Sequence, residues 1–110
     1  MDKNILVIDD DESIIWVIKK ALEPSGYKIT SRTRLASGLK AVQDKTHIVL
    51  LDLILPDGDG LDGLREIRSI NPETIVIMIT ANAKMQSTIT AMKEGAYDYI
   101  EKPFDIEELK

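Results

Sequence analysis

The chain has 110 residues, 44% of them hydrophobic and 30% charged, with no cysteine and a formal net charge of −5. The acidic balance argues against direct nucleic-acid contact by this segment, since a phosphate backbone needs a basic face. Disulfides and thiolate metal sites are excluded, which fits a reducing cytoplasm. No hydrophobic run approaches the roughly 20 residues that span a bilayer, so we expect a single cytoplasmic domain without membrane contact.

Strand-like and helix-like segments alternate along the chain. Aliphatic runs at residues 5–8, 48–51 and 75–79 are typical of strands buried on both faces, and 27–31 and 97–100 are weaker strand candidates. Hydrophobic residues recur at helical spacing between them, in stripes formed by Ile14, Ile18, Ala21 and Leu22; Leu35, Leu39 and Val42; Leu61, Leu64, Ile67 and Ile70; and Met85, Ile89, Met92 and Ala96. A last, truncated helix is expected from near Asp105. This alternation predicts an α/β fold whose parallel sheet is covered on both faces.

Polar residues stand where the predicted strands end. Asp9 and Asp10 follow the first strand, Asp52 and Thr80 end the third and fourth, and Lys102 follows the fifth. In an open parallel sheet, ligands bind outside the carboxyl ends of the strands. We therefore expect these five side chains to meet at one edge of the sheet.

This set of groups suits phosphoryl transfer to a carboxylate. Three neighbouring carboxylates would raise one another's pKa, and a hard cation such as Mg²⁺ relieves the repulsion. A carboxylate beside the cation can stay ionised and act as a nucleophile. Lys102 would add positive charge and the Thr80 hydroxyl a hydrogen bond to the transferred group.

Several other residues have ordinary structural interpretations. Asp11 is a candidate cap for the helix that follows it. His47, the only histidine, precedes a strand and is interpreted as a surface residue rather than a ligand or phosphodonor. Met85 and Met92 lie on a helical stripe and are predicted to be core residues. Trp16 lies off the main stripe of its helix, and we expect it to be partly exposed.

The segment 57–62 superficially resembles a calcium-binding loop. The resemblance fails because Leu61 occupies a ligand position, Asp62 the position of the glycine and Arg68 that of the bidentate glutamate. We interpret the segment as a turn, since residues 56–60 are rich in proline, aspartate and glycine.

Four short motifs follow one another along the chain. They are Ile8-Asp9-Asp10-Asp11, residues 51–56 (Leu-Asp-Leu-Ile-Leu-Pro) together with Gly60, Thr80-Ala81, and Lys102-Pro103-Phe104. With these motifs the sequence resembles the receiver domain of bacterial response regulators over essentially its whole length. The resemblance implies a flavodoxin-like, doubly wound sheet of five parallel strands in the order 2-1-3-4-5. Residues 13–17 and 96–99 further resemble the nitrogen-regulatory (NtrC) class.

The resemblance also implies roles for individual residues. Asp52 would accept a phosphoryl group from a sensor histidine kinase. Asp10, Asp52 and the backbone carbonyl of Ile54 would ligate Mg²⁺, with Asp9 assisting, often through water. Because Ile54 is apolar where some family members place a polar group, we expect slow self-dephosphorylation, with Asn82 as a second influence.

Three further residues complete the implied mechanism. Lys102 would pair with the phosphoryl group, and the Lys102–Pro103 peptide bond would be cis. Thr80 and Tyr99 would form a switch pair, in which Thr80 moves toward the phosphoryl group and Tyr99 fills the vacated space. The change would alter the face formed by the fourth helix and the fifth strand.

The resemblance places residues 1–110 in the N-terminal part of a longer response regulator. Its implied partners are a sensor histidine kinase, an ATPase or DNA-binding output domain in the same chain, and a second copy in a phosphorylation-dependent homodimer. The domain would be a phosphoacceptor switch that catalyses only its own phosphorylation and dephosphorylation.

Three alternative functions fit parts of the sequence pattern. A Mg²⁺-dependent phosphohydrolase resembling the haloacid dehalogenase family would require a second aspartate at the position of Ile54, and the chain has no room for a cap domain. A receiver-like module that is never phosphorylated usually lacks a key acid or the lysine, and here these are present. A flavodoxin-like nucleotide-binding domain would want a glycine-rich loop after the first strand, and the sequence has none there.

Overall fold

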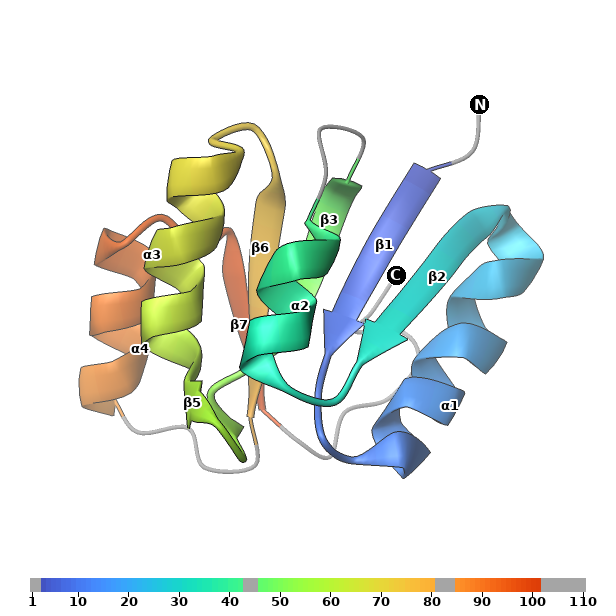
Figure 1. The fold of residues 1–110 in the computed structure, drawn as a ribbon, viewed down its shortest axis with the longest axis horizontal. Coiled ribbons are helices and arrows are strands. Elements are labelled where there is room, and N and C mark those ends of the chain that lie inside the picture. The colour runs from blue at the N-terminus through green and yellow to red at the C-terminus, as the bar shows by residue number, and fades with distance from the viewer. Residues whose placement is uncertain (1–2, 43–45, 81–84, 102–110) are drawn as a thin grey trace.

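The computed structural model describes residues 3–42, 46–80 and 85–101, and Figure 1 shows their arrangement. Within them, five strands form one parallel sheet. Their order across the sheet is β2 (Tyr27–Arg32), β1 (Lys3–Ile8), β3 (Thr46–Asp52), β6 (Ile75–Thr80) and β7 (Asp98–Glu101). The predicted helix near Asp105 lies outside the described residues.

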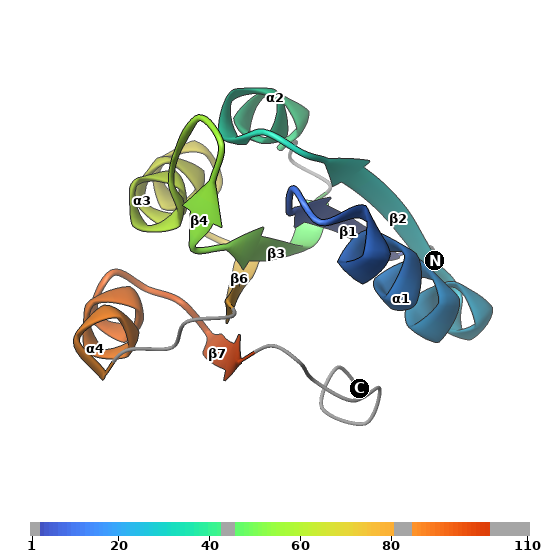
Figure 2. The same cartoon turned by 90° about the horizontal axis from the view of Figure 1, so that it is seen from below.

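Helices connect the strands and cover both faces of the sheet. They are α1 (Glu12–Leu22), which continues into the short 3-10 helix η1 (Glu23–Ser25), α2 (Leu35–Ala41), α3 (Gly60–Ile70) and α4 (Met85–Lys93). Figure 2 shows α2, α3 and α4 on one side of the sheet and α1 on the other. The predicted α/β class, with a parallel sheet covered on both faces, is therefore confirmed. None of the helices in the described part of the chain is long and apolar enough to cross a membrane.

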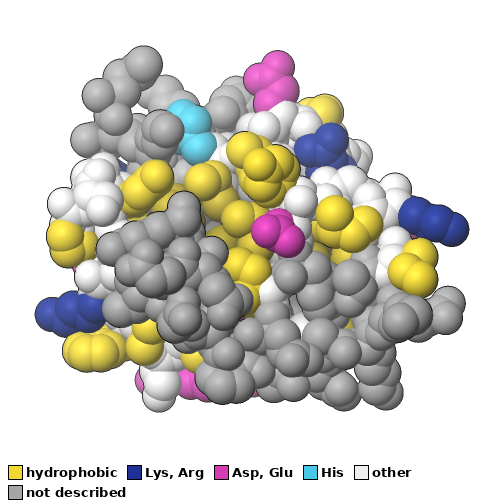
Figure 3. Space-filling model, turned by 180° about the vertical axis from the view of Figure 1, so that it is seen from behind, with side chains coloured by type: hydrophobic (Ala, Val, Ile, Leu, Met, Phe, Trp, Pro, Cys, Tyr) yellow, Lys and Arg dark blue, Asp and Glu magenta, His cyan; other side chains and the backbone are white. Residues whose placement is uncertain are grey.

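Alternate residues of the central strands build two separate cores. Leu6 and Ile8 of β1 belong to a cluster under α2, α3 and α4, and Ile5 and Val7 belong to a cluster under α1. Figure 3 shows the molecule from behind, where hydrophobic side chains gather over the sheet. Each fully buried aliphatic side chain contributes roughly 1.5–3 kcal/mol to stability, so these clusters fix the positions of the strand ends.

Two details of the first helix agree with the sequence. The Asp11 carboxylate accepts the Ser13 backbone N–H at 2.9 Å, which confirms the predicted cap. Trp16 is 62% exposed, and the Lys20 amine lies 5.6 Å from the centre of its ring. The predicted partial exposure of Trp16 is confirmed.

The helical stripes include residues that the fold leaves outside the core. Met92, predicted to be buried, is 46% exposed, and Ile70 and Ile89 are each 49% exposed. The prediction for Met92 was wrong because Ala91 and Ala96, rather than the larger residue, face the core. The side chain of Met85 lies outside the described residues.

The turn at residues 56–60 carries a pairing that the sequence did not reveal. Two short strands, β4 (Ile54–Leu55) and β5 (Gly58–Asp59), pair in antiparallel fashion on either side of the Pro56-Asp57 turn. This small hairpin lies directly between Asp52 and the start of α3, so its geometry bears on the position of Asp52.

His47 is an exposed residue within β3 and forms a β-bulge. Asn4 of β1 pairs with Thr46 whereas Ile5 pairs with Ile48, so His47 is the extra residue. Its Nδ1 accepts the Asn4 backbone N–H at 3.1 Å. The interpretation of His47 as a surface residue is confirmed, with a local structural role added.

Candidate functional site

The carboxyl ends of β1 and β3 bring three acidic residues together. Asp9 follows β1, Asp52 ends β3, and these strands are neighbours with Ile8 paired to Leu51. One carboxylate oxygen from each of Asp9, Asp10 and Asp52 lies within 4.8 Å of the others. Asp9 and Asp52 are buried, at 0% and 5% exposure, and Asp10 is exposed. The predicted gathering of these three carboxylates is therefore present.

The composition of this cluster suits a divalent cation. Carboxylate oxygens are the ligands that hard cations such as Mg²⁺ and Ca²⁺ prefer. A divalent cation would offset the negative charge that three neighbouring carboxylates concentrate at this edge of the sheet. The exposed Asp10 leaves one side of the cluster open to water and to an incoming ligand. The residues present could thus hold a divalent metal ion.

The turn between β1 and α1 orients Asp9. Its Oδ1 accepts the Asp11 backbone N–H at 2.9 Å, and its own backbone N–H donates to the Arg32 carbonyl at 3.0 Å. The first bond extends the capping arrangement of α1, and the second ties the turn to the end of β2. Two backbone contacts, with Asp11 and with Arg32, therefore restrain the position of Asp9 before any ligand arrives.

The loop after β3 is equally constrained around Asp52. The Asp52 Oδ1 accepts the Ile54 backbone N–H at 3.3 Å. The Leu53 N–H donates to the Ile79 carbonyl of β6 at 3.3 Å, and the Leu53 carbonyl accepts the Gly60 N–H at 2.7 Å. These bonds hold the residues after Asp52 between β6 and the start of α3.

Gly60 is required by a close backbone approach. A Cβ atom at this position would lie 2.2 Å from the Asp52 carbonyl oxygen and 2.7 Å from the Leu53 Cα. No side chain can be accommodated there without moving the backbone that carries Asp52. The sequence motif included Gly60, but only the structure gives the physical reason.

The structure describes only some of the other predicted site residues. Thr80 ends β6 and is 1% exposed, at the same edge of the sheet as Asp52. Ile54 is 63% exposed beside the acidic cluster. Tyr99 lies in β7, paired with Met78, but its side chain is outside the described residues. Lys102, Pro103 and Asn82 also lie outside them.

Asp57 is a site-supporting residue that sequence reasoning missed. Its carboxylate accepts backbone N–H groups at the start of α2, from Leu35 at 2.6 Å and from Ala36 at 3.0 Å. The bonds from Ala36 and then Leu35 lower the pKa of Asp57 below its ordinary value of 3.8. The sequence did contain a signal for this contact. Arg34 precedes α2 and provides no side-chain cap, so the free backbone N–H groups at the start of the helix need a hydrogen-bond acceptor from another segment.

Comparison with known proteins identifies the family. Residues 5–110 match the response regulator receiver domain family. The chain is 41% identical over 105 residues to the DNA-binding transcriptional regulator NtrC of Escherichia coli K12, and the match covers 94% of this chain and 22% of NtrC.

Two solved structures extend the comparison. A response regulator from Burkholderia pseudomallei with a phosphorylated aspartic acid, a calcium ion and citrate has a TM-score of 0.89 at 29% identity, covering 98% of this chain and 64% of that one. The beryllofluoride-activated NtrC4 receiver domain dimer, a solution structure, has a TM-score of 0.91 at 34% identity, covering 96% of this chain and 88% of that one.

This chain belongs to the response regulator receiver domain family of two-component systems. Its fold is the flavodoxin-like fold of that family. Receiver domains of this family act as phosphoacceptor switches rather than as classical enzymes, and they bind divalent metal. The matched region spans about a fifth of the length of NtrC, so this chain covers only part of that relative.

Proposed function

We propose that this domain accepts a phosphoryl group on Asp52 in a reaction that requires Mg²⁺. The observation that carries the proposal is the gathering of carboxylate oxygens from Asp9, Asp10 and Asp52 within 4.8 Å, at the carboxyl ends of adjacent strands. The phosphorylated aspartic acid and the calcium ion in the Burkholderia pseudomallei regulator support it.

Asp52 is the nucleophile in this proposal. One of its carboxylate oxygens forms a bond to phosphorus as the bond between phosphorus and the histidine nitrogen of the donor kinase breaks. Mg²⁺, when bound, supplies positive charge that offsets the negative charge of the carboxylates and the transferred group. Asp10, Asp52 and the Ile54 carbonyl would ligate it, with Asp9 assisting. The backbone bonds around Asp9 and Asp52 pre-organise the acids and lower the cost of assembling the site.

Thr80 and Lys102 would act on the transferred group. Thr80 ends the strand next to β3, where its hydroxyl can donate to a phosphoryl oxygen after a small movement. Lys102 would pair with the same group, next to a cis bond to Pro103, by resemblance to the family. Thr80 and Tyr99 would then form the switch pair that alters the face of α4 and β7.

The partners follow from this chemistry and from the relatives. We propose that residues 1–110 form the receiver part of a longer cytoplasmic regulator, phosphorylated by a sensor histidine kinase. Its output would be transcriptional, as the name of NtrC indicates for that protein. A phosphorylation-dependent homodimer is supported by the activated NtrC4 receiver dimer.

The decisive experiment uses a small phosphodonor. The domain is incubated with acetyl phosphate and Mg²⁺, and the added phosphoryl group is located by mass spectrometry. We expect one modification at Asp52, abolished by Asp52→Asn and by a chelator, and retained in the control variant Asp62→Asn on the exposed face of α3. A modification elsewhere, or one that persists in Asp52→Asn, would disprove the proposal. Steady hydrolysis of p-nitrophenyl phosphate would instead support the phosphohydrolase alternative.

A further inference from the structure

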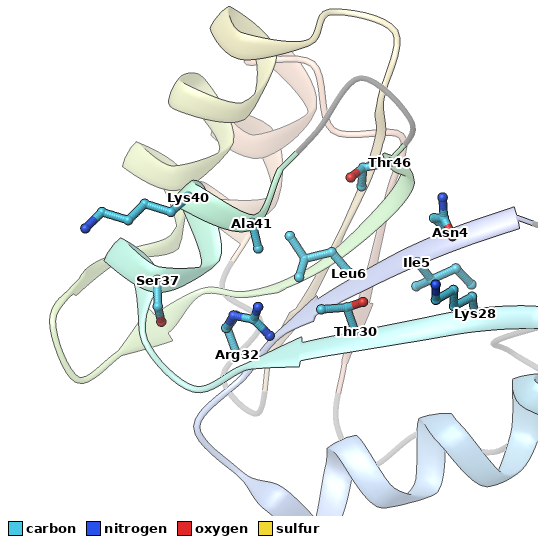
Figure 4. Close-up of a pocket in the computed structure, with 10 residues that line it drawn as sticks. All are labelled: Asn4, Ile5, Leu6, Lys28, Thr30, Arg32, Ser37, Lys40, Ala41 and Thr46. Carbon is cyan, nitrogen blue, oxygen red and sulfur yellow. The ribbon is translucent and has the colours of Figure 1, made fainter.

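A cavity that none of the three clustered acids lines lies between α2 and the edge of the sheet. Its volume is about 570 Å³, within the range of roughly 300–1,000 Å³ typical of small-molecule sites. Residues of β1, β2, α2 and β3 line it (Figure 4). None of the ten described residues in this lining is acidic, although acidic residues outnumber basic ones by 19 to 14 in the whole chain.

The edge strand β2 explains why this cavity is polar and basic. Lys28, Thr30 and Arg32 alternate along β2 and are all exposed. They share a face with Leu6, which pairs with Thr30 and belongs to the core under α2. Helix α2 has only seven residues, and the cavity opens between it and this part of the sheet. The strand thus presents a row of cationic and hydroxyl groups where a longer helix would require hydrophobic ones.

Figure 4 shows how the side chains are distributed around the cavity. The Arg32 side chain lies between β2 and α2, and Lys28 lies further along the same strand, whereas Lys40 extends away from them. One Arg32 guanidinium nitrogen donates to the Ser31 carbonyl at 2.7 Å, which restrains the head group. Leu6 and Ala41 contribute an apolar surface, and Thr30 and Ser37 contribute hydroxyls.

These groups define the chemistry of an occupant. A guanidinium is planar and matches the oxygens of phosphate or carboxylate groups with paired hydrogen bonds. The apolar surface favours a ligand that carries more than a bare inorganic anion, because burial of its carbon atoms adds binding energy. We propose that this cavity binds a small organic anion, with its phosphate-like group on Arg32 and its apolar part against Leu6 and Ala41, while Lys28 adds positive charge further along β2.

A binding experiment can test this site independently of phosphorylation. The ¹⁵N-labelled domain is titrated with phenylphosphonate, which cannot transfer a phosphoryl group, in the presence of a chelator that keeps divalent ions from the acidic cluster. Parallel titrations use inorganic phosphate, benzyl alcohol and a short peptide of glutamates. We expect saturable amide shifts at Thr30, Arg32, Ser37 and Ala41 with phenylphosphonate, with a Kd on the order of 1–10 mM for so small a probe.

Matched variants assign the effect to the basic groups. Arg32→Gln removes the guanidinium that binds the phosphonate, and we expect affinity for phenylphosphonate to fall roughly five- to tenfold. Lys28→Gln removes a cation further along β2, and we expect affinity to fall roughly two- to fourfold. Lys93→Gln, which removes an exposed cation from α4, is the control and should change affinity less than about twofold. Circular dichroism confirms that all three variants remain folded.

Four results would overturn the proposal. They are no saturable shift, shifts that lie outside the cavity, equal weakening by Lys93→Gln, and inorganic phosphate binding as tightly as phenylphosphonate, which would indicate only a general attraction of anions. Binding of the glutamate peptide without binding of phenylphosphonate would also overturn it, in favour of an acidic protein segment as occupant.

Discussion

The Asp57 carboxylate accepts the Leu35 backbone N–H at 2.6 Å, although the two residues are 22 positions apart in the sequence. With the bond from Ala36, this contact provides α2 with the cap that Arg34 does not supply. Leu35 in turn packs against Gly58 and Gly63, where added Cβ atoms would each lie 2.6 Å from its side chain. The β4–β5 hairpin next to Asp52 is thereby fastened to α2.

Replacing Asp57 should therefore loosen both elements. We expect Asp57→Asn to destabilise the domain, because the amide carries no charge and can accept the two N–H groups only with its single oxygen. Asp57→Ala should destabilise it further. The measurement is the urea midpoint at neutral pH, with Glu66→Gln on the exposed face of α3 as the control that changes a carboxylate to an amide without loss of such bonds. Equal midpoints for Asp57→Asn and Glu66→Gln would refute the capping role.

The same contact predicts a specific pH dependence. The bonds from Ala36 and Leu35 hold the pKa of Asp57 below 3.8 in the folded state, so the unfolded chain takes up this proton at a higher pH. The stabilisation from ionised Asp57 is fully present above the unfolded pKa and is lost as the pH falls through the folded pKa. The stability difference between wild type and Asp57→Asn should be constant above about pH 5 and shrink below about pH 4. A difference that grows on acidification would contradict this assignment.

Gly60 should be sensitive to even the smallest side chain. Gly60→Ala places a methyl group against the Asp52 carbonyl, and the resulting backbone shift should cost about 1–3 kcal/mol of unfolding free energy. It should also slow the acetyl phosphate reaction at Asp52, because that residue is displaced. The rate of modification, measured by mass spectrometry, tests the second effect.

Gly26 supplies the matched control for Gly60. Its φ of 95° makes Gly26→Ala strained by about 1–2 kcal/mol, but an added Cβ has nothing within 4 Å. The two variants should lose comparable stability, and only Gly60→Ala should lose reactivity at Asp52. If both variants react at the wild-type rate, the close approach at Gly60 does not position Asp52.

The local sequence pattern was enough to predict the helices and strands and the clustering of Asp9, Asp10 and Asp52. The ends of buried strands can be recognised from where hydrophobic runs stop, and the carboxyl ends of parallel strands lie at the same edge of the sheet. The local sequence pattern did not predict features that depend on contacts between segments far apart in the sequence. The cap that Asp57 gives to α2 and the bulge at His47 depend on register and on the path of a loop. The exposure of Met92 depends on which residues of α4 face the core, which hydrophobicity alone does not decide.

The metal affinity of the cluster should depend on Asp10. Asp10→Asn removes one of the three gathered carboxylates, and Mg²⁺ affinity measured by isothermal titration calorimetry should fall at least about tenfold. A unit charge at 4 Å contributes roughly 1 kcal/mol even in bulk water, and a divalent ion doubles that. Asp11→Asn changes the neighbouring aspartate, which caps α1 and lies outside the cluster, and should leave affinity within about twofold. Similar losses in both variants would point to general electrostatics instead of ligation.

The exposed side chain of Ile54 should make the phosphorylated domain slow to lose its phosphoryl group. Ile54 is 63% exposed beside Asp52 and offers no polar atom in its side chain to orient an attacking water. Ile54→Asn and Ile54→Glu should each accelerate loss of the acyl phosphate, by up to about a hundredfold for a well-placed general base. The decay is followed after removal of acetyl phosphate, and Ile54→Val is the apolar control that should decay at the wild-type rate. Since the backbone of Ile54 is held by its pairing with Asp59, these substitutions change the side chain while preserving the loop. Unchanged or slower decay in both polar variants would show that water reaches the phosphoryl group by another route.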